Sequence, residues 1–118
     1  MASYKELAVW QKAMELVEEI YRLIKLLPKE ERYALSDQMR RAAISIPSNI
    51  AEGQARESKK EFLRFLAIAQ GSRAEVETQL EICIRLNYFS EAYASCSKEL
   101  CDELGRMIYA MMKNLRNL

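Results

Sequence analysis

The stretch SYKELAVWQKAMELVEEIYRLIKLLP, residues 3–28, decides the fold class because it reads as one long amphipathic helix. Ser3 and Glu6 match the S-x-x-E capping box, which predicts a helix that begins at about Tyr4. Pro28 predicts that this helix ends at about Leu27.

Apolar residues recur along this helix in two rows at helical spacing. At about 100° per residue, the rows together cover an arc of roughly 200°, about twice the width of one core face. We therefore expect one row to face the helix's own bundle and the other to face a second subunit. The first row is Leu7, Trp10, Met14, Val17, Tyr21 and Ile24, and the second is Val9, Ala13, Leu16, Ile20, Leu23 and Leu27. The candidate oligomer interface is Val9, Leu16, Ile20, Leu23 and Leu27.

A second helix is predicted from Ser36 or Asp37 to about Arg56, after a short turn. Pro47 lies inside it. A proline there removes a backbone hydrogen bond, so we predict a kinked second helix. Gly53 is expected to loosen its last turn.

Two more helices complete the chain. Ser58 and Glu61 form a second capping box, which begins a helix that runs to about Leu86. Ser90 caps a final helix that continues to the C-terminus. Short connections favour antiparallel neighbours, so residues 1–118 are predicted to form a single all-α domain, an up-down four-helix bundle.

Composition narrows the function classes. The 118 residues include no histidine, which removes the commonest general base and the commonest transition-metal ligand. Glu75, Glu77 and Glu81 are carboxylates on one helix, but di-metal bundle sites pair such residues with histidine. We expect no enzyme activity, no metal and no cofactor.

The sequence also limits where the protein is expected to act and which partners its charge favours. The three cysteines are predicted to be free thiols in a reducing cytoplasm, and the chain start shows no signal-peptide pattern. No apolar run approaches the roughly 20 residues of a membrane span, so no membrane partner is expected. A net charge of +1 gives no global electrostatic argument for nucleic acid.

A polar stripe follows the second helix at helical spacing. Ser45, Asn49, Glu52 and Arg56 share one side of it, beside the core row. One interpretation is a binding site, and the other is a structural network that fixes helix register. Arg73 falls on the apolar face of the third helix, where it can pair with Glu77, reach Glu52 or extend to solvent.

Basic residues gather on the stretch that spans the turn between the second and third helices. As a phosphate-contacting set they would bind nucleic acid, and as ordinary ion pairs they would form a solvated surface. The candidate nucleic-acid-binding residues are Arg40, Arg41, Arg56, Lys59 and Lys60, with Arg64 nearby.

The segment RAAISIPSNIAEG, residues 41–53, closely resembles the signature of a bacterial family of four-helix-bundle proteins encoded by intervening sequences in 23S ribosomal RNA genes. The resemblance continues through residues 4–14, 62–69, 71–72 and 75–82 and is weakest in the last helix. It implies an up-down bundle that assembles as a homopentamer. A distant relative, the accessory variability protein of diversity-generating retroelements, is a basic pentamer that binds nucleic acid and a reverse transcriptase. This sequence departs from the family pattern at Ala55 and Arg73 and in its near-neutral charge.

Three function hypotheses follow. The first is a non-enzymatic homo-oligomeric scaffold, a pentamer by the resemblance, whose partner is RNA or a nucleic-acid enzyme. The second is a purely structural or protein–protein interaction module with no nucleic-acid binding. The third is a catalytic or small-molecule site at Asn49, Glu52 and Arg56.

Overall fold

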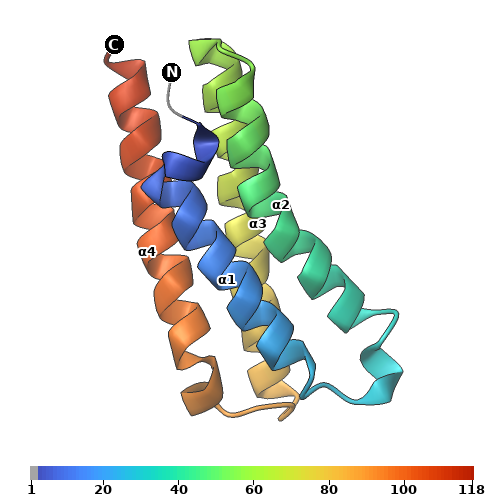
Figure 1. Cartoon of the computed structure of the whole chain (residues 1–118). Coiled ribbons are helices and arrows are strands. Elements are labelled where there is room, and N and C mark those ends of the chain that lie inside the picture. The colour runs from blue at the N-terminus through green and yellow to red at the C-terminus, as the bar shows by residue number, and fades with distance from the viewer. Residues whose placement is uncertain (1–2) are drawn as a thin grey trace.

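A computed structural model describes residues 3–118 as an all-helical chain. Its elements are the 3-10 turn η1 (Tyr4–Glu6), helix α1 (Ala8–Ile24), the 3-10 turn η2 (Lys29–Glu31), and helices α2 (Leu35–Ala55), α3 (Lys59–Arg85) and α4 (Glu91–Arg116) (Figure 1). Consecutive helices run in opposite directions, so both chain termini lie at one end of the molecule. The predicted up-down four-helix bundle is confirmed.

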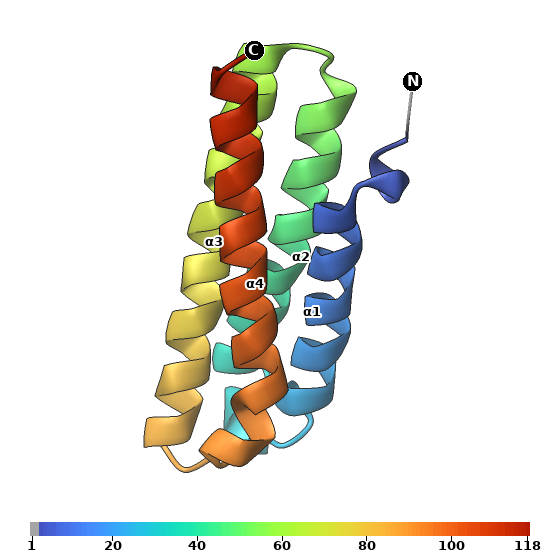
Figure 2. The same ribbon diagram turned by 90° about the vertical axis from the view of Figure 1, so that its left-hand side faces the viewer.

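The helices occupy the corners of a square. Each packs against its neighbours in the chain, and α1 also packs against α4, which closes the bundle (Figure 2). The principal extents are 46 × 24 × 20 Å. Within residues 3–118, no helix combines the length and the apolar character that crossing a membrane requires.

The chain enters α1 through a separate turn, which differs from the predicted single helix. The hydroxyl of Ser3 accepts a hydrogen bond from the Lys5 amide at 3.2 Å, so it caps η1 rather than α1. Leu7 then adopts an extended conformation with ψ 126°, and α1 begins at Ala8. The predicted end near Leu27 was also wrong, because α1 stops at Ile24 and a tight turn follows.

The apolar row of α1 that we predicted to be the oligomer interface packs in the chain's own core instead. Val9, Leu16, Ile20 and Leu23 are at most 5% exposed and pack in the core, and Leu27 is partly buried against it. A helix at a corner of a square contacts two neighbours, so a broad apolar arc is buried within a single chain. In the other row, which we call the outward row, Met14 and Tyr21 are 38% and 40% exposed. Ile24 of that row is buried, and Leu7, Trp10 and Val17 are partly buried against the core.

Helix α2 is one uninterrupted helix across the buried Pro47, and the kink that we predicted there is not confirmed. Pro47 has no backbone N–H, so it removes one hydrogen-bond donor from the helix. In the neighbouring turn, the side-chain amide of Asn49 donates to the Ser45 carbonyl at 2.7 Å. The caps of the later helices are as predicted, with Ser58 accepting from the Glu61 amide and Ser90 from the Tyr93 amide.

Candidate functional site

The polar stripe of α2 divides into two parts. In the inner part, the Ser45 hydroxyl lies 2.9 Å from the Ser72 hydroxyl of α3 and accepts from the Asn49 amide at 2.9 Å. Ser72 is buried and the other two are partly buried. These hydrogen bonds join α2 to α3 where both helices are packed, which is the geometry of a structural network.

In the outer part, Arg56 pairs with Glu52 at 3.0 Å and with Glu61 of α3 at 3.5 Å. Arg64 also pairs with Glu61 at 3.2 Å, and its guanidinium lies 4.4 Å from the centroid of the Phe65 ring. The hydrogen bond from Arg64 lowers the pKa of Glu61. This is a surface ion-pair chain over the turn between α2 and α3, and Glu52 is not part of the inner network.

The candidate nucleic-acid-binding residues do not form one surface. Arg40 and Arg41 lie near the start of α2 and both pair with Asp37, at 3.8 and 3.1 Å. Arg56 follows Arg40 by 16 positions, so the two are about 24 Å apart along the helix axis. The prediction of a single cluster was therefore wrong for Arg40 and Arg41.

Lys59 and Lys60 contribute instead to a basic groove between α3 and α4. The groove has a volume of about 600 Å³ and no acidic residue lines it. Lys59 donates to the Leu118 carbonyl at 3.1 Å. Lys60 and Arg116 make no ion pair with any Asp or Glu among residues 3–118. The lining residues are Lys59, Lys60, Leu63, Arg64, Ala67, Met112 and Arg116.

Sequence reasoning missed Arg116 because it lies more than 50 positions after Lys60. The antiparallel pairing of α3 and α4 brings the last turn of one helix beside the first turn of the other (Figure 2). The basic residues of that last turn, Lys113 and Arg116, were the available signal.

Arg73 of α3 takes part in a set of contacts that connects α3 with α4. It pairs with Glu77 on its own helix, not with Glu52, and donates to the Gln70 side chain at 2.7 Å. Gln70 in turn donates to the Gly105 carbonyl of α4 at 3.0 Å. A Cβ at Gly105 would lie 2.9 Å from the Arg73 guanidinium carbon, so the charged group covers this glycine.

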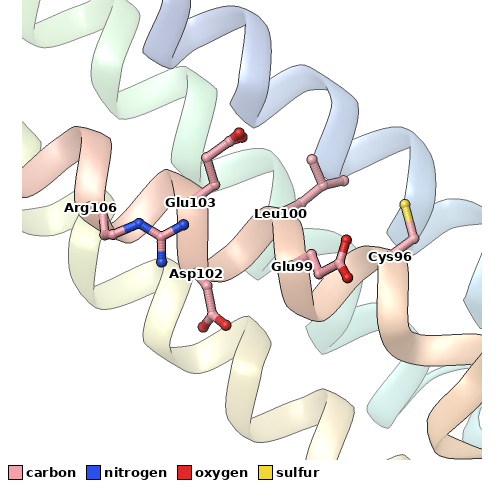
Figure 3. Close-up of a pocket in the computed structure, with 6 residues that line it drawn as sticks. All are labelled: Cys96, Glu99, Leu100, Asp102, Glu103 and Arg106. Carbon is pink, nitrogen blue, oxygen red and sulfur yellow. The ribbon is translucent and has the colours of Figure 1, made fainter.

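A shallow pocket on α4 combines a thiol with several charges, but its chemistry is weak (Figure 3). Cys96 is exposed, but partial desolvation of its sulfur raises the pKa of the thiol, and the negative charges of Glu19 and Glu99 raise it further. The raised pKa keeps Cys96 a thiol rather than a nucleophilic thiolate. Glu103 is engaged by Lys12 of α1 at 3.3 Å. The lining residues are Cys96, Glu99, Leu100, Asp102, Glu103 and Arg106.

Metal ligation has no geometric support in the described part of the chain. No group of three His, Cys, Asp or Glu side chains among residues 3–118 is placed to hold an ion. In the carboxylate set of α3, Glu77 pairs with Arg73 and Glu81 with Lys98.

Fold and surface together define a four-helix-bundle protein with a basic groove near its termini. The model of the 23S rRNA-intervening sequence protein family matches residues 5–110, so the chain belongs to that family. It is similar to the crystal structure of a protein of unknown function from the S23 ribosomal protein family of Bacteroides thetaiotaomicron. Identity is 28% and the TM-score is 0.82, with 90% of this chain and 99% of that chain covered. No curated protein matches the chain.

Proposed function

We propose that the protein is a non-enzymatic, homo-oligomeric scaffold that binds RNA through the basic groove between α3 and α4. The observation that carries the proposal is the lining of this groove, which has four cationic side chains and no acidic side chain. Phosphate contacts of this kind supply most of the sequence-independent affinity for nucleic acid.

The charges of the groove are available to a ligand in different degrees. Arg64 is held by Glu61, and Lys59 by the Leu118 carbonyl. Lys60 and Arg116 are exposed and make no such contact with residues 3–118. These two side chains can therefore bind phosphate without first breaking an ion pair, and they are the residues that a test should change.

Assembly into an oligomer would strengthen RNA binding, because each subunit would contribute one basic groove. The outward row of α1 presents Met14 and Tyr21 to solvent, while Trp10 and Val17 of the same row are partly buried against the chain's own core. These two exposed apolar side chains lie on one side of the helix, where a second subunit would cover them. Symmetry would repeat the basic groove in every subunit, and several weak phosphate contacts would then act on one RNA strand.

RNA affinity measured at several salt concentrations tests the proposal. We expect the logarithm of affinity to fall linearly with the logarithm of salt concentration, with a shallower slope in Lys60→Gln and Arg116→Gln. Lys5→Gln is the matched control, because Lys5 is an exposed cation outside the groove. Equal effects of all three changes, or no binding, would contradict the proposal.

The second candidate is a purely structural or protein–protein interaction module. The same outward row of α1 favours it, because that surface needs no nucleic acid. Under this proposal the assembled protein has no measurable RNA affinity at any salt concentration, while changes to the outward row alter its mass or partner binding.

A further inference from the structure

A second basic pocket lies at the opposite end of the bundle from the basic groove. It is formed where α1 ends, η2 crosses and α2 begins, far from both chain termini in Figure 1. Its volume is about 330 Å³, within the range of small-molecule sites. Lys25, Lys29, Arg32 and Arg40 line it, and no acidic residue does.

The nearby carboxylates are largely engaged elsewhere. Glu31 accepts hydrogen bonds from the Tyr88 hydroxyl at 2.6 Å and from the Leu35 amide at 3.4 Å. Asp37 binds Arg41 at 3.1 Å and reaches Arg40 only at 3.8 Å. Lys25, Lys29 and Arg32 form no ion pair within residues 3–118, so their charge is not neutralised.

A serine hydroxyl also lines the same pocket. Ser36 is only 6% exposed as a residue, and its hydroxyl makes no hydrogen bond to any residue of the described chain, but this oxygen is open to solvent rather than buried. A ligand oxygen in the pocket would accept from this hydroxyl in place of water.

The pocket is also a fixed structure rather than a loose loop. The bond between Tyr88 and Glu31 ties η2 to the turn between α3 and α4, and Arg40 donates to the Arg32 carbonyl at 3.4 Å. The remaining lining is apolar or aromatic and comprises Tyr21, Ile24, Leu27 and Pro28. A ligand that fits has a compact multiple negative charge joined to a small apolar or aromatic body.

We propose that this pocket binds a small phosphomonoester with an apolar or aromatic body. The phosphate would lie among Lys25, Lys29, Arg32 and Arg40 and accept from the Ser36 hydroxyl, with the body against Leu27 and Pro28. A phosphomonoester suits these donors because it has three acceptor oxygens and becomes a dianion above pH ~6. The proposal does not depend on RNA binding by the basic groove.

Titration calorimetry of the full chain with phenyl phosphate tests the proposal. We expect saturable binding that strengthens from pH 5 to pH 7.5 as the ligand loses its second proton, and no binding of phenol. Lys25→Gln and Arg32→Gln should each weaken binding about tenfold, the scale of one charge-assisted hydrogen bond. Absent binding, or equal binding of phenol, would overturn the proposal.

Two controls separate this pocket from general charge attraction. Lys5→Gln removes the same charge outside both the pocket and the basic groove and should leave phenyl phosphate affinity unchanged. Tyr88→Phe keeps every charge but removes the anchor of η2, and it should weaken binding. An equal loss in Lys5→Gln would contradict a built site, and so would unchanged affinity in both Tyr88→Phe and Lys25→Gln.

The same phosphate chemistry also occurs at the 5′ end of an RNA strand. Competition against phenyl phosphate by adenosine monophosphate and by a 5′-phosphorylated oligonucleotide distinguishes the two sources. The proposal expects the mononucleotide to compete at least as well. Stronger competition by the oligonucleotide that depends on Lys25 would assign the pocket to strand ends and overturn a small-molecule ligand.

Discussion

Gly53 of α2 lies so close to Phe65 of α3 that a Cβ built on the glycine would sit 2.7 Å from the Phe65 Cβ. Phe62 closes the other side of the same space, with a ring carbon at 3.1 Å. The two helices therefore approach each other closely just before the turn that joins them. This contact places Lys59 and Lys60 at the rim of the basic groove.

Replacing Gly53 by alanine should destabilise the fold. The Phe65 Cβ belongs to a packed helix and cannot move aside, and overpacking of this kind costs about 1–3 kcal/mol. Gly71→Ala is the matched control, because a Cβ there meets nothing within 4 Å and alanine is the better helix former by about 0.5–1 kcal/mol. Urea unfolding should show opposite signs for the two variants. Two changes of the same sign would contradict the close approach.

Sequence predicted the helices well because caps and periodicity are local signals. Ser58 and Ser90 cap the helices that they were expected to cap. The role of Gly53 was missed, because the reason for a glycine there is Phe65, a residue on another helix. The predicted oligomer interface on α1 was wrong for a similar reason. Periodicity fixes which residues share a side, but only packing against α2 and α4 decides which side faces inward.

The inner network should carry stability, and Glu52 should not. Asn49→Ala removes the donor to Ser45 and leaves partly buried groups without a partner, at a cost of about 1–3 kcal/mol. Glu52→Gln removes only an exposed ion pair, for which about 0.5 kcal/mol or less is expected. Urea unfolding measures both changes. A larger loss in Glu52→Gln would show that the whole polar stripe acts as one network.

The thiols should differ in accessibility. Burial raises the pKa of Cys83 to about 11 and that of Cys101 to about 12, and both side chains are buried. At pH 8 a chromogenic disulfide reagent should therefore modify one thiol of the three in the folded protein and all three in urea. Cys96→Ser should abolish the reaction of the folded protein. Rapid reaction of a second thiol would contradict the burial of the other two.

Tyr88 gives the fold a pH dependence in alkali. Its hydrogen bond to Glu31 raises the pKa of the hydroxyl from 10.0 to about 12. The folded chain holds this proton more tightly than the unfolded chain, so the stabilisation is complete below pH 10 and is lost as the pH rises to about 12. Unfolding of the wild type and of Tyr88→Phe over this range should show a difference in stability that shrinks with pH. Other tyrosines and lysines titrate in both proteins, so parallel curves would rule out the Tyr88 contribution.

The basic groove shows where sequence reasoning about the site stops. Lys59 and Lys60 were identified because they are adjacent in the chain, whereas Arg116 joins them only through the pairing of α3 with α4. Arg40 was grouped with them by sequence proximity, yet the length of α2 carries it to the other end, beside Lys25 and Arg32. One basic stretch in the sequence therefore divides between two separate basic surfaces in the fold.

The outward row of α1 should determine the mass of the particle. Met14→Glu places a charge on this row without entering the core, because Met14 is 38% exposed. We expect light scattering to report a smaller particle with unchanged helix content, since a buried unpaired charge opposes association. Ala92→Glu adds the same charge at an exposed position of α4 and should leave the mass unchanged. Leu16→Glu, at a fully buried position of α1, should instead unfold the chain. If Ala92→Glu dissociates the particle and Met14→Glu does not, the subunits meet on α4 and the outward row of α1 is an ordinary surface.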